Sequence, residues 1–396
     1  MSCEWFCNAR LVLPDRVTPG CLRVENGAVT DVLDRPWPRE NAAGTDLGGQ
    51  YLAPGFVEIH SHGAGGADFM DGTPEAFLTA AGTHLRHGVT TLFPTSVAAG
   101  LDGVMQFLRA FKKVKAPLML AGAMSAGHIT PGVHLEGPYL RMEMRGAIDP
   151  RYIKPPDPAE YEALLEFADG DIRRWTAAPE LPGALAFGDA LGKRGILPSI
   201  GHTCANYAEI KEAFRHGFTH FTHLYSAMST ITRRSGFRIT GAIESAYILE
   251  DATVEVIADG CHLPLELLHY VYKAKGADRV CLTTDSMRCA GTQAARSVIG
   301  SLEDGLPVIV EDGVAKLPDR SAFAGSIATA DRLLRTALEA GIPLHDAVRM
   351  MSLTPARVMG LDRETGSIAA GKQADLVMFD DAIAIKNVMK RGTWVI

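Results

Sequence analysis

The sequence predicts a (β/α)8 barrel that carries a small β-sandwich built from both ends of the chain. Three observations support this prediction. Apolar runs alternate with helical patterns through the middle of the chain, metal-binding residue types follow the ends of these runs, and both termini carry β patterns instead. Such alternation is typical of a parallel sheet, and eight repeats suit a closed barrel. We expect the β-sandwich to comprise residues 1–53 and 361–396, and the barrel to comprise residues 54–360.

The two ends of the chain predict the β-sandwich. Residues 20–33 alternate in polarity and turn at Asn26-Gly27, which is a strong hairpin signal. Near the other end, residues 366–380 and 386–396 also have the composition of strands. We therefore expect the larger domain to be inserted between two halves of one β unit.

The middle of the chain predicts eight strands separated by helices. The expected strands are 56–60, 88–94, 132–136, 173–178, 196–201, 217–223, 253–259 and 278–284. Helical patterns lie between most of them, at 73–87, 102–115, 157–169, 182–194, 206–216 and 264–276. These lengths match ordinary strands and helices of an α/β protein.

Composition excludes several classes of protein. The 396 residues are 47% hydrophobic and 21% charged, as in an ordinary soluble globular protein. A net charge of -7 argues against broad binding to nucleic acid or anionic membranes. We expect no membrane span and no signal peptide, since Glu4 interrupts the start of the chain. Seven cysteines without a CxxC pair suit reduced thiols, so we expect a cytoplasmic protein.

Two histidines close the first predicted strand. His60 and His62 follow the apolar run that begins at Phe56 and are separated by one residue. In a strand, residues i and i+2 point to the same face, so the two rings can converge on one ion. Neutral imidazole is a common ligand for divalent metals. The pair therefore predicts part of a metal site.

Other polar residues follow the later strands. They are Glu136 after the third strand, His202 after the fifth, His223 at the end of the sixth, Asp259 and His262 after the seventh, and Asp285 after the eighth. In a (β/α)8 barrel the functional site lies at the carboxyl ends of the strands. Nitrogen and carboxylate ligands of this kind suit Zn²⁺ or a similar divalent ion.

Three polar residues near these positions are expected to have other roles. His134 alternates with Glu136 and could be a ligand on spacing alone, but we favour a structural role. Glu180 ends the fourth strand and is expected to shape the mouth of the barrel. We expect Asp259 to hold a loop rather than to bind the metal.

The motifs, taken in order, resemble those of the N-acetylglucosamine-6-phosphate deacetylases of the amidohydrolase superfamily. They are "PGFVEIHSHG", "GVHLEGPYL", "IGHT", "FTHLYSAM", "IADGCHLP", "LTTDSM", "FAGS" and "GSIAAGKQADLVMFD". The last motif is shared across amidohydrolases, whereas the combination is specific and covers nearly the whole chain. The resemblance implies hydrolysis of N-acetylglucosamine 6-phosphate to glucosamine 6-phosphate and acetate.

The resemblance also implies the metal ligands. One divalent ion would be held by Glu136, His202 and His223. His60 and His62 match a pair that helps to bind a second metal in some members. Glu136 would take the place of the carboxylated lysine that bridges two metals in many relatives. Zinc is favoured, with iron, manganese, cobalt and nickel as alternatives, and one or two ions remain open.

Two further residues match the family's catalytic groups. Asp285 corresponds to the catalytic aspartate, which would take a proton from the attacking water and deliver it to the departing nitrogen. His262 corresponds to the histidine that contacts the substrate and polarises the amide carbonyl. Stabilisation of the oxyanion by one such donor is typically worth roughly 3–4 kcal/mol of barrier.

The substrate-binding residues depart from the family pattern at several positions. Arg234, between Arg233 and Arg238, aligns with an arginine that reaches the phosphate, often across a homodimer interface, although these arginines could equally be a solvated face. Ser226-Ala227-Met228 replaces the usual Asn-Ala-Met, and Ile148 replaces a polar residue. Arg233-Arg234-Ser235-Gly236 replaces Arg-x-Pro-Gly. We expect Ser226 and Ala227 to contact the amino-sugar phosphate.

Two alternatives to this substrate remain open. The departures around the sugar-phosphate pocket favour testing a related N-acyl sugar, such as an N-acetylgalactosamine phosphate. A non-catalytic binding barrel is the other alternative, and the complete set of ligand-type residues argues against it.

Overall fold

The barrel is formed by eight parallel strands. The structure is a computed structural model that describes residues 3–35, 44–115 and 129–396. The strands are β6 (Phe56–Ser61), β9 (Val89–Ser96), β10 (Val133–Glu136), β11 (Ile172–Ala177), β12 (Leu197–Ile200), β13 (His220–Phe221), β16 (Thr253–Ile257) and β17 (Val280–Thr283). They are hydrogen-bonded in this order, from β6 to β17. Each coincides with one predicted strand, so the predicted fold class is confirmed.

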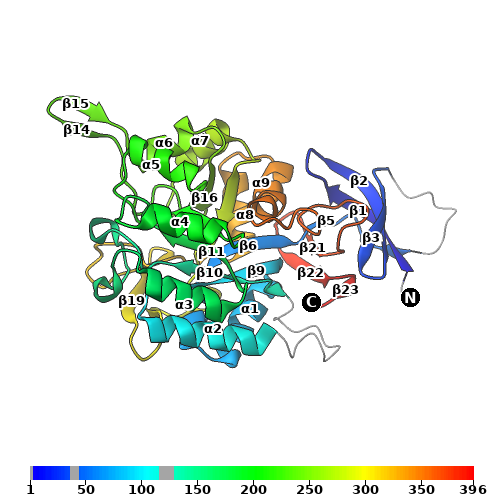
Figure 1. The fold of residues 1–396 in the computed structure, drawn as a ribbon. Coiled ribbons are helices and arrows are strands. Elements are labelled where there is room, and N and C mark those ends of the chain that lie inside the picture. Colours follow the sequence, from blue (N-terminus) through cyan, green and yellow to red (C-terminus); the bar gives the residue numbers. More distant parts are fainter. Residues whose placement is uncertain (1–2, 36–43, 116–128) are drawn as a thin grey trace.

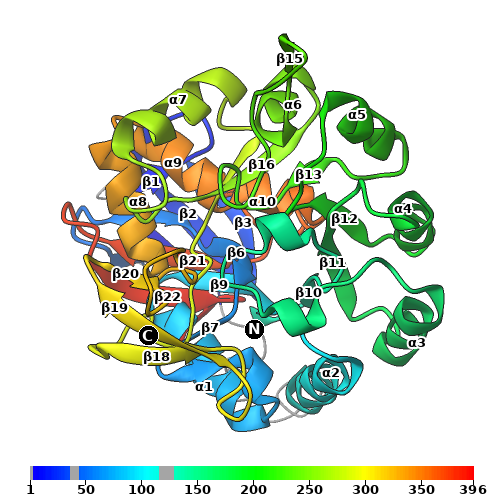
Figure 2. The same cartoon turned by 90° about the vertical axis from the view of Figure 1, so that its left-hand side faces the viewer.

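Residues at the carboxyl ends of β6 and β17 close the barrel. The backbone N–H of Asp285 donates to the carbonyl of His60 over 3.0 Å, and the N–H of His62 donates to the carbonyl of Ser286 over 2.8 Å. Figure 2 shows the strands surrounded by a ring of helices. Because all strands run in parallel, their carboxyl ends meet at one face of the barrel.

The helices cover the outside of the barrel. They are α1 (Pro74–Arg86), α2 (Leu101–Lys115), α3 (Pro158–Ala168), α4 (Ala184–Gly192), α5 (Tyr207–Arg215), α6 (Ala242–Ile248), α7 (Leu265–Lys275), α8 (Ala330–Glu339), α9 (Leu344–Met351) and α10 (Leu353–Val358). Six of them match the predicted helices. Polar side chains begin several: Thr73, Asp157 and Asn206 each accept a hydrogen bond from the first turn of α1, α3 and α5.

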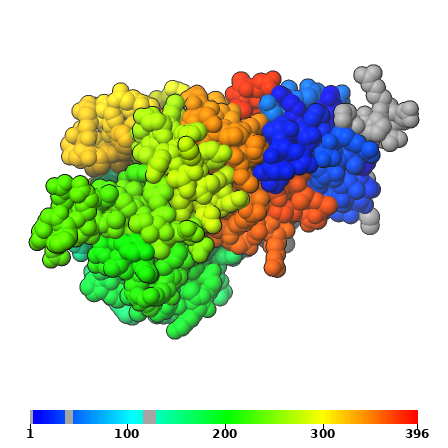
Figure 3. Space-filling view, turned by 90° about the horizontal axis from the view of Figure 1, so that it is seen from above, coloured from blue at the N-terminus to red at the C-terminus, as the bar shows by residue number. Residues whose placement is uncertain are grey.

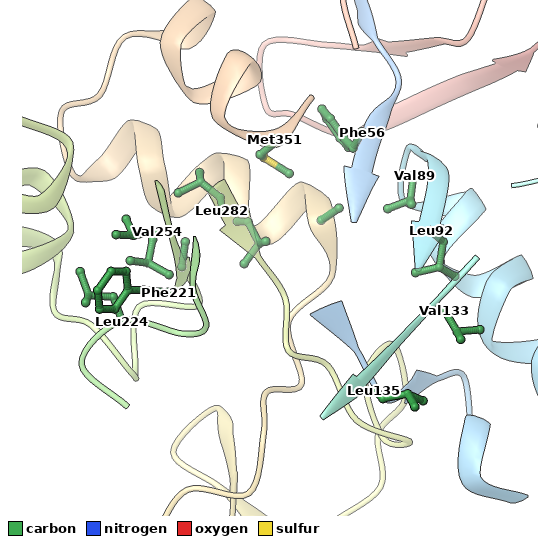
Figure 4. Close-up of a cluster of buried hydrophobic side chains, with 14 of the residues drawn as sticks. Phe56, Val89, Leu92, Val133, Leu135, Phe221, Leu224, Val254, Leu282 and Met351 are labelled. Carbon is green, nitrogen blue, oxygen red and sulfur yellow. The ribbon is translucent and has the colours of Figure 1, made fainter. Parts of the chain in front are cut away.

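The barrel core consists of apolar side chains from the strands and the inner faces of the helices. Figure 4 shows Val89, Leu92, Val133 and Leu282 among these side chains, and all are buried. Strands covered on both faces read as continuous apolar runs, which is why the sequence predicted their positions well.

Both ends of the chain contribute to one sheet. It contains β1 (Cys3–Val12), β2 (Val17–Glu25), β3 (Ala28–Leu33), β4 (Thr45–Asp46) and β5 (Tyr51–Pro54) together with β21 (Leu376–Phe379), β22 (Ile385–Lys390) and β23 (Thr393–Trp394). β5 pairs with both β1 and β21, which joins the two halves. Asn26 and Gly27 have φ angles of 52° and 82°, as the predicted two-residue turn requires. Figures 1 and 3 show this unit at one end of the molecule.

Short elements at the carboxyl end of the barrel were not predicted. They are the pairs β7 (Gly63–Ala64) with β8 (Ala67–Asp68) and β14 (Thr232–Arg234) with β15 (Phe237–Ile239), the sheet of β18 (Arg296–Ile299), β19 (Leu306–Glu311) and β20 (Val314–Lys316), and the 3-10 turns η1 (Phe69–Asp71), η4 (Met142–Met144) and η5 (Pro150–Tyr152). The β14–β15 hairpin projects from the molecule in Figure 1. Across the described ranges, no helix is both long and apolar enough to cross a membrane.

Candidate metal centre

Six predicted residues meet at the carboxyl end of the barrel in two groups. They are Glu136, His202 and His223 in one group, and His60, His62 and Asp285 in the other. Within each group, the atoms that can bind a metal lie within 4.8 Å of one another. All six residues are buried. The structure therefore brings together every metal-ligating residue that the sequence predicted, and it adds Asp285 to the set.

Glu136 lies between the two groups. Its Oε1 atom is 3.3 Å from Nε2 of His202 and 3.0 Å from Nε2 of His223. The same Oε1 is 3.6 Å from Nε2 of His60, and Oε2 is 3.3 Å from Nε2 of His62. One carboxylate thus faces four imidazoles, which is the geometry needed to serve both groups at once.

Several buried atoms in the site lack a partner that a cation would supply. Nε2 of His60 and Oδ1 of Asp285 are buried without a hydrogen bond, although buried polar atoms are normally paired. The Nε2 atoms of His202 and His223 are 3.1 Å apart, and both face Glu136. Imidazole and carboxylate donors suit zinc and the later first-row divalent ions. The residues therefore fit a divalent metal.

Three residues of the site have left-handed backbones. His202, His223 and Asp285 have φ angles of 47°, 32° and 43°, and each lies two residues beyond the end of its strand. Such conformations cost of the order of 1–3 kcal/mol in a non-glycine residue and cluster at functional sites. The turns after β12, β13 and β17 are therefore shaped to aim these side chains at the centre of the barrel mouth.

The surrounding charges keep Asp285 ionised. Burial raises the pKa of the Asp285 carboxyl, but His60 and His62 lower it more, so that it lies below its usual value. Oδ1 of Asp285 is 3.4 Å from Nε2 of His60 and 3.2 Å from Nε2 of His62. An ionised carboxylate at this position can accept a proton.

His134 has a structural role. Its Nδ1 lies 3.2 Å from the hydroxyl of Thr95, and its Nε2 lies 2.8 Å from the hydroxyl of Thr176. Burial holds the pKa of His134 well below its usual value, so the ring is neutral. Both ring nitrogens of His134 therefore have hydrogen-bond partners. The His134 and His60 rings pack edge to face, with 4.8 Å between their centroids.

His262 lies in the wall of the same cavity and is oriented by Asp259. Oδ2 of Asp259 is 2.8 Å from Nδ1 of His262, and Oδ1 accepts the backbone N–H groups of Cys261 and His262. Burial raises the pKa of Asp259, but its hydrogen bonds with His262 outweigh burial and keep that pKa below its usual value. Asp259 therefore holds the loop and the ring, which is the role predicted for it.

We expect Asp259→Asn to lower turnover about 10- to 100-fold, the usual effect of removing a partner that orients a functional histidine. The asparagine keeps the loop contacts but loses the charge that supports His262. The measurement is kcat together with metal content per chain. Metal content should stay at the wild-type level, and a loss of metal would contradict the assigned role.

The cavity above the metal residues has a volume of about 210 Å³. It is lined by Ser226 and Ala227, the two residues expected to contact the substrate, and by the apolar side chains of Ile148, Ile257 and Phe323. Arg234 is not among its lining residues, because it lies on β14 of the exposed hairpin. One chain alone therefore places Ser226 and Ala227 at the cavity, but not Arg234.

Glu180 shapes the barrel mouth, as predicted, by accepting the hydroxyl of Thr203 over 2.6 Å and the N–H of Cys204 over 2.7 Å. Sequence reasoning missed two residues, Arg174 and Glu255, which lie buried beneath the metal residues. Their signal was a charged side chain inside a predicted strand of the barrel.

The family model described as Amidohydrolase family matches residues 51–395. The chain belongs to the amidohydrolase family. The N-acetylglucosamine-6-phosphate deacetylase of Haemophilus influenzae is 31% identical over 88% of this chain and 87% of its own length. The N-acetylgalactosamine-6-phosphate deacetylase of Escherichia coli O157:H7 is 28% identical over 94% of this chain and 93% of its own length.

Solved structures agree with this family membership. A mutant of the Mycobacterium smegmatis N-acetyl-D-glucosamine-6-phosphate deacetylase, in complex with N-acetyl-D-glucosamine-6-phosphate, superposes with a TM-score of 0.90 at 32% identity over 100% of both chains. The Thermotoga maritima N-acetylglucosamine-6-phosphate deacetylase superposes with a TM-score of 0.86 at 29% identity over 99% of both chains. The resemblance inferred from the motifs of this amidohydrolase is thus confirmed.

Proposed function

We propose that this amidohydrolase removes the acetyl group from N-acetylglucosamine 6-phosphate and releases glucosamine 6-phosphate and acetate. The observation that carries the proposal is the convergence of two buried metal-ligand groups on Glu136, beside the ionised Asp285. Relatives that carry this name match almost the whole chain. The metal-ligand residues and the Asp285 carboxylate together suit the hydrolysis of an amide.

The metal would be held by Glu136, His202 and His223, with His60 and His62 available for a second ion. Zinc is the ion that we propose first, because the donors are imidazole and carboxylate. A divalent ion in such a site lowers the pKa of its water and polarises a carbonyl oxygen.

The chain's own residues supply proton transfer and orientation. Asp285 takes a proton from the attacking water and returns it to the nitrogen of the departing amino sugar, so one carboxylate serves both steps. His262 is oriented by Asp259, which accepts its Nδ1 proton. In this step the imidazolium form of His262 donates from Nε2 to the oxygen of the scissile carbonyl as negative charge develops there. The surrounding apolar wall, which includes Phe323, limits the access of bulk water.

The phosphate requires a cationic partner, and we propose that Arg234 supplies it from the second subunit of a homodimer. Arg234 is exposed on the projecting hairpin of its own chain, where it can reach a neighbour. Arginine recognises phosphate through paired, charge-assisted hydrogen bonds.

We expect Arg234→Ala to raise KM for the phosphorylated sugar about 10- to 100-fold, because a hydrogen bond to a charged group contributes about 1.5–3 kcal/mol. Steady-state kinetics with phosphorylated and unphosphorylated N-acetylglucosamine measure this effect, and light scattering measures the oligomeric state. Arg233→Ala, on the same strand, is the matched control. Equal KM changes for both sugars would contradict phosphate recognition by Arg234.

A second candidate substrate is N-acetylgalactosamine 6-phosphate. Ser226 and Ile148 line the cavity at positions where the sequence departs from the expected pattern, and a relative at 28% identity is named for that substrate. Acetate release from both sugar phosphates by zinc-reconstituted protein decides between them. Activity on neither, with metal bound, would refute deacetylation of these substrates.

We also propose a cytoplasmic location and the division into residues 1–53, 54–360 and 361–396. The location is supported by the free thiols of Cys7, Cys21, Cys204, Cys261, Cys281 and Cys289. The division is supported by the shared sheet, in which β5 from the first segment pairs with β21 from the last.

A further inference from the structure

A buried ion pair lies directly beneath the metal residues. Nη1 of Arg174, on β11, is 2.6 Å from Oε2 of Glu255, on β16, and neither side chain is exposed to solvent. Replacing such a pair by apolar residues often leaves the stability of the folded protein unchanged or raises it, because removing two charges from water is costly. Packing alone therefore does not account for an arginine and a glutamate at the centre of the barrel.

Glu255 contacts one residue from each metal-ligand group. Its Oε1 atom is 2.6 Å from Nδ1 of His60 and also accepts the backbone N–H of His223 over 3.1 Å. One carboxylate oxygen thus holds the ring of a residue on β6 and the backbone after β13. Any movement of Glu255 would be transmitted to both groups.

The contact with Glu255 determines which nitrogen of His60 carries the proton. An imidazole that binds a metal is neutral and has one N–H donor and one free lone pair, and an ionised carboxylate can only accept. The N–H of His60 is therefore at Nδ1, facing Glu255. The Nε2 lone pair is left free, and Nε2 is the buried atom without a hydrogen bond that faces Asp285 and Glu136.

Arg174 fixes Glu255 from the other side. In addition to Glu255, its guanidinium donates to the carbonyl of Ile59 over 3.2 Å, the hydroxyl of Ser199 over 2.9 Å and the hydroxyl of Thr222 over 2.8 Å. These partners lie on β6, on β12 and in the segment after β13. The planar guanidinium therefore ties neighbouring strands to one carboxylate.

We propose that Glu255, oriented by Arg174, is a positioning residue that holds His60 in the tautomer whose Nε2 lone pair faces the metal site. The inference rests on the metal centre that the proposed function requires, but not on the substrate. Partners of this kind orient histidine ligands and raise their basicity.

The test is Glu255→Gln. A glutamine has one acceptor oxygen, and Arg174 requires it, so the NH2 group turns to His60. An NH2 group facing Nδ1 moves the imidazole proton to Nε2 and blocks that nitrogen as a ligand. We expect the affinity for the Zn²⁺ ion that contacts His60 to fall about 10- to 100-fold, measured by titration against a chromophoric chelator.

The double variant Arg174→Met, Glu255→Gln distinguishes positioning from packing. Without Arg174, the glutamine oxygen is free to accept from His60, so Zn²⁺ affinity should rise above that of the single variant. Asp375→Asn is the matched control, because Asp375 also forms a buried 2.6 Å pair, with Lys390 in the terminal sheet. That variant should bind Zn²⁺ like the wild type.

Two results would overturn the proposal: wild-type Zn²⁺ affinity in Glu255→Gln, or weaker binding in the double variant than in the single one. If Glu255→Gln does not fold, the 15N shifts of the His60 ring in zinc-loaded wild-type protein decide, because a ligating imidazole carries a single proton. A proton on Nδ1 supports the proposal, and a proton on Nε2 refutes it. All these readouts report on metal or tautomer, so failure of deacetylation would be seen separately.

Discussion

Asp285→Asn should lose most turnover while the protein still binds metal through Glu136, His202 and His223. The carboxylate lies 3.2 Å from Nε2 of His62, and its pKa stays below the usual value because the nearby histidines outweigh burial. An amide of the same shape cannot accept and return the proton. We expect kcat to fall about 10²- to 10⁴-fold, the range for loss of a general acid–base group.

The measurement for Asp285→Asn is acetate release combined with metal analysis of the same sample. Asp285 also faces His60, so metal content should be counted per chain before and after reconstitution. Near-normal kcat would refute the role of Asp285 as proton carrier. A complete loss of metal would instead show that Asp285 acts chiefly as a ligand.

Glu136→Ala should abolish metal binding and, with it, activity. No other residue in the site lies close to His60, His62, His202 and His223 at once, at distances of 3.0–3.6 Å. Without it, the two groups lose the carboxylate that joins them, and Asp285 remains only beside His60 and His62. Because a bound metal lowers the activation barrier by several kcal/mol, we expect its loss to reduce kcat by about 10³-fold or more.

The control for Glu136→Ala is wild-type protein from which a chelator has removed the metal. Both samples should show the same residual acetate release, and only the wild type should recover when Zn²⁺ is restored. His134→Gln is a useful comparison, because His134 is buried beside the site but has hydroxyl partners at both nitrogens. Full metal content in Glu136→Ala would contradict the central position assigned to this residue.

The barrel was predictable because its strands are buried on both faces. Runs such as residues 88–94 are uncharged and largely apolar because they lie between the barrel interior and the helices, and this makes them visible in the sequence. The β14–β15 pair and the three-stranded sheet of β18, β19 and β20 were not predicted. Their strands are brief and lie largely near the surface, so apolar periodicity marks them weakly.

Strand direction and alternation can be read from the sequence, and they place His60, His62, Glu136 and Asp285 at the carboxyl ends of the strands. How these side chains meet depends on the folded barrel. Glu136 faces both ligand groups because the curvature of the barrel brings the end of β10 close to the ends of β6 and β13, which are not its neighbours in the sheet. The same closure pairs Arg174 with Glu255, 81 residues apart. Distances between strands depend on curvature and register, which local sequence patterns do not encode.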